Sequence, residues 1–382
     1  MNPRRAGSRR ISALMFALPA ILGHVATACG EQSQASGSST SAVTSGAQGG
    51  AEATPSTADP DVDYKSLSGT LNGTGSSFQD ALQQTVKGPF EKAAENVTVN
   101  YAKSGSSAGK ADLAAGIVQF AGTDSLIKDA DLPTFKGGEV LYFPVAAAPI
   151  TLSYHLEGVD ELRLSADTIA GIFQSTITTW NAPEIKADNP DANLPATPIA
   201  AVHRSDGSGT TSNFTKYLKK AAPSVWTLGA GDTVNWPAGT QGAEKNSGVA
   251  TLISSTEGAV GYVDLADSVS AKLQRALVRN KAGEYVTPQI PGASAALAGA
   301  GIAPNLTYDP LDAEGAESYP ITSPTWVIVY KQQPDAATAD ALKGYLTYLL
   351  TDGQKLAPKV GYAPLPAELQ RKAIEQLARV TG

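Results

Sequence analysis

The sequence has few of the side chains that build disulfides and metal centres. Its 382 residues include one cysteine and three histidines, and 17% of the residues are charged. A single cysteine cannot form a disulfide within the chain, and scattered histidines do not supply the ligand groups of a zinc site. A phosphate loop of the form Gly-x-x-x-x-Gly-Lys-[Ser/Thr] is also missing, so nucleotide hydrolysis is not supported. We therefore expect no metal and no cofactor.

Hydrophobic runs long enough for a comfortable membrane span are missing as well. The apolar run at 11–25 follows four arginines within residues 1–10 and ends in small residues before Cys29. This order is typical of a secretory signal. A cysteine at such a position resembles the lipobox of bacterial lipoproteins, and the alternative is an ordinary signal peptide. We predict a lipoprotein signal over 1–29, with Cys29 as the lipidated residue.

Large apolar side chains are almost absent from residues 30–64, which consist mainly of Ser, Thr, Gly, Ala and Gln. Such a segment buries too little surface to offset the entropy of ordering it, which predicts a flexible tether. Behind a lipidated cysteine, the tether would hold the folded part outside the cell, on the outer face of the cell membrane. The membrane would then be contacted through the lipid anchor only.

Positive charge is in deficit. The net charge of the whole chain is −7, and it becomes −11 once the four arginines of the signal are removed. A balance of this sign disfavours nucleic acid and anionic membrane surfaces as partners. If the ligand is an anion, groups next to it must overcome the unfavourable charge of the whole protein.

Short β-like runs alternate with helical stretches through the first half of the folded part. Each run ends in a cluster of Gly and Ser, and a helix is predicted to start directly after it. This alternation indicates an α/β fold with a parallel sheet, in which ligands bind beyond the carboxyl ends of the strands. About 320 residues suit two domains of this kind. The predicted strands are 67–71, 97–101 and 199–202, and the helices that follow are 78–94, 108–118 and 211–221.

The three Gly/Ser turns, at 72–77, 104–107 and 204–210, share a chemical property. A helix N-terminus leaves its first N–H groups unpaired and carries about half a positive charge, and glycine lets a ligand approach the backbone. Such a turn suits a tetrahedral oxyanion. Helix capping alone explains Ser or Thr at one helix start, but three such turns are harder to explain in that way. The third turn adds Arg204, which can place two N–H groups on oxygens, and Asp206, which can orient it.

A fourth segment, 119–125, reads as a strand that runs into a turn at Asp124. A carboxylate beside an anion is repulsive unless the anion carries a proton to donate. Hydrogen phosphate has such a proton and sulfate does not, so a buried carboxylate here would discriminate between them. The alternative is an ordinary turn aspartate.

At these residues the chain resembles the phosphate-binding protein (PstS) of the bacterial ABC-type phosphate importer. The resemblance implies a two-lobed, type II periplasmic-binding-protein-like α/β fold, with a mostly parallel sheet flanked by helices in each lobe and the ligand in the cleft. Lobe I would comprise 65–148 and 321–382, and lobe II 149–320. The segments that carry the resemblance are GTGSSF at 73–78, SGSSAG at 104–109, FAGTDSL at 120–126, RSDGSGT at 204–210, IAGIFQSTITTWNAP at 169–183 and NSGVATLISSTEGAVGYVD at 246–264.

The resemblance also implies a set of phosphate ligands. Phe78 would bind through its backbone N–H, and Asp206 matches the residue that forms a salt link with the arginine. Ser77 stands where some members have threonine, which keeps the hydroxyl. The function implied is that of an extracytoplasmic receptor, a monomer and not an enzyme, which delivers inorganic phosphate to the permease subunits. The implied ligands are Ser77, Phe78, Ser106, Asp124, Arg204, Ser208, Gly209 and Thr210.

Other functions remain open from the residues alone. A receptor for arsenate, sulfate or molybdate is one, and a surface antigen that retains the fold is another. A serine hydrolase is a third, because 105–109 matches Gly-x-Ser-x-Gly and 107–110 matches Ser-x-x-Lys. The first pattern needs a histidine base, and neither His155 nor His203 has a recognisable triad context.

Overall fold

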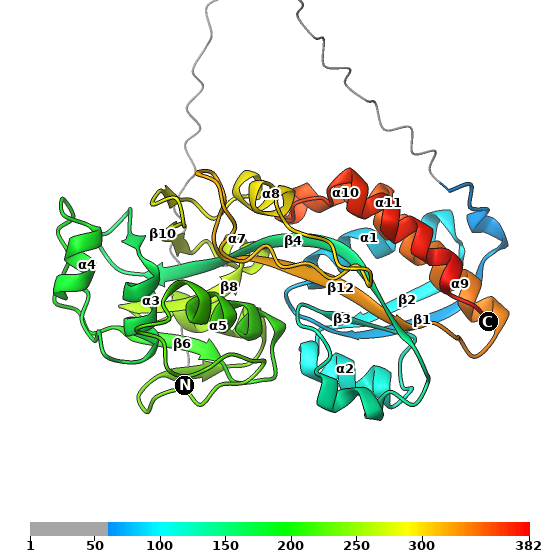
Figure 1. Ribbon diagram of the computed structural model, residues 1–382, viewed down its shortest axis with the longest axis horizontal. Helices are drawn as coiled ribbons and strands as arrows, with labels where there is room; N and C mark the ends of the chain where they lie inside the picture. The colour runs from blue at the N-terminus through cyan, green and yellow to red at the C-terminus, as the bar shows by residue number, and fades with distance from the viewer. Residues whose placement is uncertain (1–59) are drawn as a thin grey trace, which may run out of the picture. The chain divides into compact units, whose positions relative to one another are not determined.

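The computed structural model describes residues 60–382. The predicted signal with Cys29, and residues 30–59 of the predicted tether, lie outside the described residues. The main sheet has nine strands in the order β2-β1-β3-β12-β4-β8-β6-β7, with β9 paired to β4, and β11-β10-β5 form a smaller sheet (Figure 1). The strands are β1 (Ser68–Gly75), β2 (Asn96–Ala102), β3 (Phe120–Thr123), β4 (Val140–His155), β5 (Arg163–Leu164), β6 (Ala200–Arg204), β7 (Gln241–Ala243), β8 (Ala259–Asp264), β9 (Gln274–Arg275), β10 (Leu277–Arg279), β11 (Tyr285–Val286) and β12 (Thr322–Tyr330).

Helices cover the main sheet. In Figure 1, α1 and α9 lie over the strands β1 to β3, with α2 below them, and α3 and α5 lie beside β6 and β8. The helices are α1 (Asp80–Ala93), α2 (Ser106–Ala114), α3 (Ala166–Phe173), α4 (Pro183–Asp188), α5 (Gly209–Ala221), α6 (Lys245–Ser254), α7 (Leu265–Ser270), α8 (Ile290–Ala298), α9 (Ala336–Leu350), α10 (Asp352–Leu356) and α11 (Ala367–Gln376), with 3₁₀ turns η1 (Tyr64–Ser66), η2 (Asp129–Thr134), η3 (Ala357–Val360) and η4 (Leu377–Arg379).

The strand-to-helix units predicted from the sequence are present. β1 pairs in parallel with β2 and β3, and β6 pairs in parallel with β7 and β8. The α/β prediction is therefore confirmed. The strands between these two groups differ, because β12 runs antiparallel to β3 and β4, and β4 runs antiparallel to β8. The alternating pattern of strands and helices gave no sign of this antiparallel centre.

The strands β4 and β12 form the middle of the sheet. Both are buried along nearly their whole length, and neither contains an acidic residue, a lysine or an arginine. In a strand that is covered on both faces, apolar and polar side chains need not alternate. This explains why both segments are continuous apolar runs in the sequence. Three prolines lie within these strands: Pro144, Pro149 and Pro324. The register of the pair shifts between Thr325 and Trp326, as it does at a β-bulge.

The chain ends in a series of short helices. Residues 336–380 read as helical in the sequence, with breaks near Pro358 and Pro364, and the structure has α9, α10, η3 and α11 there. At the other end of the described chain, the Tyr64 ring packs edge-on against Phe90 and Tyr348, at centroid distances of 6.0 and 5.9 Å. Among residues 60–382 no helix has both the length and the apolar character that crossing a bilayer requires.

Candidate anion-binding site

The three Gly/Ser turns lie together at the carboxyl ends of β1, β2 and β6. Gly105 donates its backbone N–H to the carbonyl of Gly75 at 2.7 Å, which joins the second turn to the first. Ser107 donates its N–H to the carbonyl of Gly207 at 3.3 Å, which joins the second turn to the third. The backbone itself therefore holds the three predicted loops side by side, although they are separated by up to 130 or so residues of sequence.

The third turn ends in the N-terminus of α5. Ser208 caps this helix, and its Oγ accepts the N–H of Thr211 at 3.1 Å. The hydroxyl hydrogen of Ser208 therefore stays free to be donated elsewhere. Within residues 60–382, the amides of Gly209 and Thr210 have no protein acceptor. Unpaired amides at the positive end of a helix of 13 residues form a site for negative charge.

The first turn presents a similar set of donors. Ser77 and Phe78 precede α1, and their amides also lack an acceptor among the described residues. The Oγ of Ser77 accepts the backbone N–H of Asn246 at 3.2 Å, so its own hydrogen is likewise available. The Phe78 side chain is buried and packs edge-on against Tyr362, whose hydroxyl donates to the Phe78 carbonyl. This anchoring fixes the backbone amide of Phe78 in place.

Arg204 brings the only guanidinium among these turns. Its side chain is 1% exposed, and its Nε and Nη2 atoms donate to the two carboxylate oxygens of Asp206 at 2.7 and 2.6 Å. Nη1 donates to Oδ1 of Asn246 at 3.2 Å. Burial raises the pKa of Asp206, but hydrogen bonds and charge from Arg204 and Lys245 outweigh burial and lower it to about 2. Asp206 is therefore ionised near neutral pH and orients the Arg204 guanidinium.

Asp124 is the acidic group of the site, and it is 1% exposed. The hydroxyl of Ser76 lies 2.7 and 2.6 Å from its two carboxylate oxygens, and Thr325 Oγ1 donates to Oδ1 at 2.7 Å. Burial raises the pKa of Asp124 to about 6, against the opposing effects of the Ser76 and Thr325 hydrogen bonds and the charge of Arg204. At neutral pH this group is a buried carboxylate and can accept a further hydrogen bond.

Gly209 closes the site because it has no side chain. A Cβ atom there would lie 2.6 Å from Ser106 Oγ and 2.7 Å from Asp124 Cβ. Gly209→Ala is therefore expected to force these groups apart and to lower the free energy of unfolding by about 1–3 kcal/mol. Thermal or urea denaturation of the purified protein measures this effect.

Gly248→Ala is the matched control for this prediction. Gly248 lies in the first turn of α6, where a Cβ atom would make an ordinary contact of 3.6 Å with Ala243. Alanine is a better helix former than glycine, so this variant should be as stable as the wild type or more stable by up to about 1 kcal/mol. Equal stability of the two variants would contradict the close packing of the turns around Gly209.

The structure brings every residue of the predicted ligand set to one location. Ser106 and Gly209 lie next to Asp124, and Asn246 joins Ser77, Arg204 and Thr210 to one another. Phe78 and Ser208 are the chain neighbours of Ser77 and Gly209 in these turns. Sequence reasoning missed three residues of this arrangement: Ser76, Asn246 and Thr325. Asn246 opens one of the segments that carried the resemblance, but its contacts with Ser77, Arg204 and Thr210 are not visible in the sequence. Thr325 is 201 residues away from Asp124 and reaches it beside the β-bulge of the central strands.

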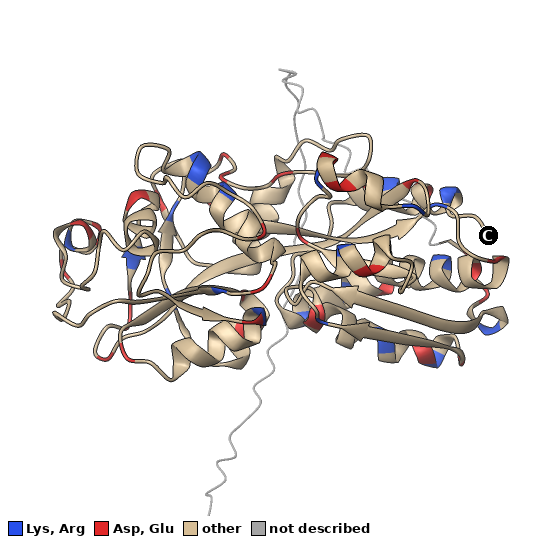
Figure 2. Cartoon of the chain, turned by 90° about the horizontal axis from the view of Figure 1, so that it is seen from below, with Lys and Arg blue, Asp and Glu red and all other residues tan. Residues whose placement is uncertain are grey.

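The described residues form no extended basic surface that would attract an anion to the site. Figure 2 shows lysines and arginines interspersed with aspartates and glutamates along the ribbon rather than gathered in one basic surface. The cations next to the site are instead committed to carboxylates, as Arg204 and Lys245 are to Asp206. Attraction of an anion therefore depends on donors in direct contact with it, since charges beyond a Debye length of about 8 Å are screened.

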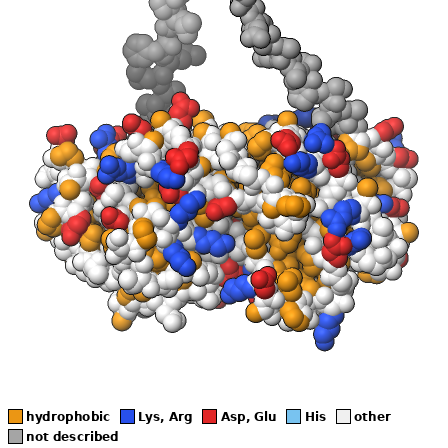
Figure 3. All heavy atoms as spheres, in the orientation of Figure 1, with side chains coloured by type: hydrophobic (Ala, Val, Ile, Leu, Met, Phe, Trp, Pro, Cys, Tyr) orange, Lys and Arg blue, Asp and Glu red, His pale blue; other side chains and the backbone are white. Residues whose placement is uncertain are grey.

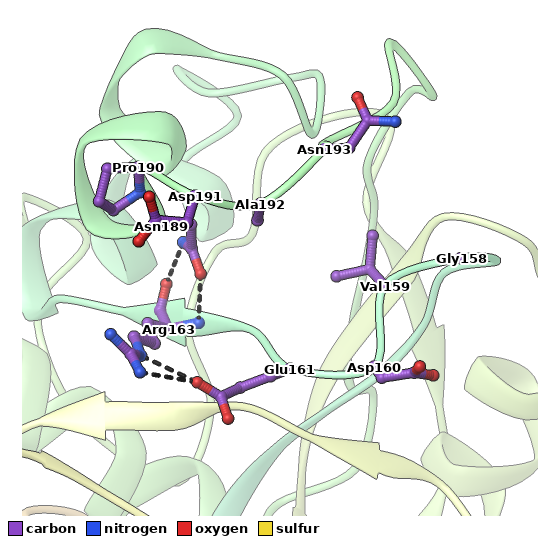
Figure 4. Close-up of a pocket in the computed structure, with 10 residues that line it drawn as sticks. All are labelled: Gly158, Val159, Asp160, Glu161, Arg163, Asn189, Pro190, Asp191, Ala192 and Asn193. Carbon is purple, nitrogen blue, oxygen red and sulfur yellow. Dashed lines mark hydrogen bonds and ion pairs between the residues drawn. The ribbon is translucent and has the colours of Figure 1, made fainter.

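Hollows elsewhere on the protein suit an oxyanion less well. One of about 310 Å³ is lined by residues between Gly158 and Asn193 (Figure 4). Its carboxylates are Asp160, Glu161 and Asp191, and its one cation, Arg163, is bonded to Glu161 at 2.8 Å. A second, more apolar hollow of about 870 Å³ adjoins α2 and Tyr330, and Figure 3 shows hydrophobic side chains near the place of α2. In the first hollow the carboxylates outnumber the cation, and the lining of the second is mainly apolar, so neither is suited to an anion.

Comparison with known proteins gives the family. A family model described as the PBP superfamily domain matches residues 30–353. The phosphate-binding protein PstS of Xylella fastidiosa strain 9a5c is 32% identical over 331 residues, which cover 85% of this chain and 88% of that protein. The phosphate-binding protein PstS of Pasteurella multocida is 33% identical over 313 residues, which cover 79% of this chain and 88% of that protein.

Solved structures show the same fold. A high-affinity periplasmic phosphate-binding protein (PfluDING) bound with phosphate has a TM-score of 0.68 at 21% identity, over 81% of this chain and 94% of that chain. A putative phosphate ABC transporter substrate-binding protein from Clostridium perfringens, with bound phosphate, has a TM-score of 0.57 at 16% identity, over 78% of this chain and all of that chain. The predicted periplasmic-binding-protein-like fold is thereby confirmed. Because the named relatives are at least 32% identical over most of both chains, the chain belongs to the PstS family of phosphate-binding proteins.

Proposed function

We propose that this protein is a receptor that captures inorganic phosphate, as HPO₄²⁻ or H₂PO₄⁻, for an ABC-type import permease. The observation that carries the proposal is the convergence of unpaired amides and hydroxyls from three turns around the buried carboxylate of Asp124. Hydroxyls and amides donate to phosphate oxygens, Arg204 supplies positive charge, and Asp124 accepts the proton that the anion carries. The two relatives named above are both phosphate-binding proteins, which supports the same ligand.

The ligand set is part of this proposal. Ser77, Ser106 and Ser208 would donate through their hydroxyls, and Phe78, Gly209 and Thr210 through their amides. The orientation of two hydroxyl groups supports the assignment. The oxygens of Ser77 and Ser208 each accept a backbone N–H, so their hydroxyl hydrogens are available to donate to the anion. Asp206 would act on the ligand only through Arg204.

We also propose that the chain works as two lobes. Lobe I would comprise 65–148 and 321–382, and lobe II 149–320, so that the chain would pass between them twice, within β4 and just before β12. The boundary near residue 149 is supported by the pairing of β4, which turns from β12 to β8 at Pro149 and Ile150. Since both lobes would supply ligands, phosphate would favour the closed arrangement, and this form would be presented to the permease.

A hydrolase is less well supported than a binding protein. Ser107 donates its hydroxyl to Asp232 at 2.8 Å, and Ser106 Oγ lies 3.4 Å from Asp124 Oδ2. Among the hydrogen bonds of residues 60–382, neither hydroxyl has a histidine partner that would act as a base. The Lys110 of the Ser-x-x-Lys pattern is paired with Asp232 at 2.9 Å, and its hydrogen bonds go to Asp232, Ser125 and Leu126 rather than to Ser106 or Ser107. Capture of the anion needs no nucleophile.

The decisive experiment is a calorimetric titration of the mature domain, freed of copurified anion, with phosphate, sulfate and arsenate side by side. We expect tight phosphate binding with one ion per chain, and sulfate binding weaker by at least ~100-fold, because sulfate has no proton for Asp124. Arsenate carries the same proton and is the second candidate ligand. Failure of phosphate to bind, or equal affinity for phosphate and sulfate, would contradict the proposal.

A pH dependence follows from the raised pKa of Asp124. Below about 6 this carboxyl group is protonated and can donate a hydrogen bond, and above about 6 it is ionised and repels an anion without a proton. Sulfate affinity should therefore rise as the pH falls through about 6 and be lost as the pH rises, whereas phosphate, which keeps a proton in this range, should change less. Titrations about one pH unit below and one above that pKa measure the effect. A sulfate affinity that is independent of pH would exclude this role of Asp124.

The location and assembly state complete the proposal. Cys29 would carry the lipid, residues 30–64 would form the tether, and a monomer would act on the outer face of the cell membrane. Metabolic labelling with a radioactive fatty acid tests the anchor: the wild type should be labelled, and Cys29→Ala should not. Equal labelling of the two would place the lipid elsewhere.

A further inference from the structure

A buried ion pair lies behind the candidate site, between residues that the ligand set does not include. Lys110 on α2 donates from Nζ to Oδ2 of Asp232 at 2.9 Å, and the two side chains are 11% and 8% exposed. Lys110 Nζ also donates to Ser125 Oγ at 2.9 Å and to the Leu126 carbonyl at 3.2 Å. All three ammonium hydrogens are thus used, as a buried lysine requires.

Asp232 is tied to the site by its own contacts. Its Oδ2 atom accepts the hydroxyl of Ser107 at 2.8 Å, and its backbone carbonyl accepts the N–H of Ser208, the cap of α5, at 2.9 Å. Burial raises the pKa of Asp232, but the charge and hydrogen bond of Lys110, together with the Ser107 hydroxyl, outweigh burial and hold it below its usual value. Asp232 is therefore an ionised carboxylate in direct contact with two of the three anion-binding turns.

The position of Asp232 creates an electrostatic difficulty. Its negative charge acts on Asp124 and contributes to the raised pKa of that group. An anion bound beside Asp124 would feel the same charge, because interactions between buried groups are weakly screened. A carboxylate here opposes anion capture unless a cation next to it balances its charge.

We propose that Lys110 is a positioning residue for anion binding, which neutralises the Asp232 carboxylate and so keeps its charge from adding to that of Asp124. Lys110 would not touch the ligand. It would act through Asp232, and through the hold of Asp232 on the Ser208 cap. The inference rests on the proposed function, since it treats the Asp124 site as the place where phosphate binds.

Other charged groups around Asp232 do not replace Lys110. Lys216 on α5 also interacts with Asp232 through space, and burial lowers the pKa of Lys216. Among the described residues, however, no hydrogen bond joins Lys216 to Asp232. Arg204 is already committed to Asp206 and Asn246. The compensation at Asp232 therefore falls mainly on Lys110.

The test is a double-mutant cycle of Lys110→Met, Asp232→Asn and the two combined. Lys110→Met should weaken phosphate binding about tenfold or more, because it leaves a buried negative charge near the anion. Asp232→Asn in the Lys110→Met background removes that charge, and should restore the affinity to within about threefold of the wild type. Lys92→Met, which removes an exposed lysine from α1, is the control for the loss of one positive charge and should leave the affinity unchanged.

A second measurement does not depend on phosphate. Aspartate labelled with ¹³C at the carboxyl carbon lets the Asp124 titration be followed by NMR in the ligand-free protein, with Asp124→Asn used to assign the signal. Lys110→Met should move the Asp124 midpoint to higher pH, and the double variant should move it back. If Lys110 had only a structural role, Lys110→Met would lower the stability of the protein. It would not raise the Asp124 midpoint, and the double variant would not bring the midpoint back.

The outcomes separate the inference from the proposed function. An Asp124 midpoint that Lys110→Met leaves unchanged overturns the inference, even if phosphate binds as expected. A double variant that binds phosphate no better than Lys110→Met overturns it as well. If the wild type fails to bind phosphate, the proposed function fails, and the NMR titration still decides whether Lys110 controls the charge at Asp124. If Lys110→Met does not fold, the phosphate affinity of the double variant is compared with that of Asp232→Asn. Because Lys110 would act through the Asp232 carboxylate, the two variants should bind phosphate alike, and a much weaker double variant would overturn the inference.

Discussion

Arg204→Ala is expected to weaken phosphate binding by at least about 2 kcal/mol, or ~30-fold. The Arg204 guanidinium is the one full positive charge placed in the ligand set, and its side chain is almost fully buried. Its loss also leaves Asp206 with Lys245 as its remaining cation, so a carboxylate close to the anion becomes less well balanced. Calorimetric titration with phosphate measures the effect.

Arg204→Lys provides the matched comparison. Lysine keeps the charge but has no planar fork, and so cannot bond Asp206, Asn246 and an oxyanion at the same time. We expect an affinity between those of the wild type and Arg204→Ala. Thermal denaturation without phosphate should accompany both variants, because loss of the Asp206 contact also lowers stability. An unchanged dissociation constant for a folded Arg204→Ala protein would remove Arg204 from the site.

Asp124→Asn is expected to narrow the difference between phosphate and sulfate affinity by about 100-fold. The asparagine has nearly the same shape, and its carbonyl oxygen can still accept the hydroxyls of Ser76 and Thr325. Its NH₂ group then faces the ligand as a donor. A donor favours an oxygen without a proton, so sulfate should gain affinity while phosphate loses its proton acceptor.

Asp131→Asn is the control for this substitution, since it also removes one negative charge but lies in the exposed turn η2. It should leave the ratio of the two affinities as in the wild type. The pH dependence of sulfate binding should also vanish in Asp124→Asn, because an amide does not titrate. Sulfate rejection that persists unchanged in Asp124→Asn would mean that another group discriminates between the two anions.

The local elements of this fold were predictable because each had a simple cause. The buried residues Val97, Val99 and Tyr101 alternate in β2, and Ser208 stands where α5 needs a cap. The turns that hold the site could be predicted because three Gly/Ser turns at helix starts are harder to explain by capping alone than one. The resemblance to a known family then turned three separate turns into one ligand set.

Contacts between distant segments were not predictable in this way. Thr325 bonds Asp124 because a register shift in β12 lies beside it, and nothing in the local sequence announces that shift. Asn246 and the Lys110–Asp232 pair likewise depend on which loops meet after folding. A hydrogen-bond partner 122 residues away leaves no periodic signal.

The three prolines of the central strands have a consequence for the chain before it folds. The segments that become β4 and β12 are apolar and contain no lysine, arginine or acidic residue, which makes them the kind of sequence that stacks between molecules as cross-β ribbons. Pro144, Pro149 and Pro324 lack the N–H group that every rung of such a ribbon uses. The native sheet accommodates all three prolines, and the same residues would thus hinder aggregation before β4 and β12, which are far apart in the sequence, have paired.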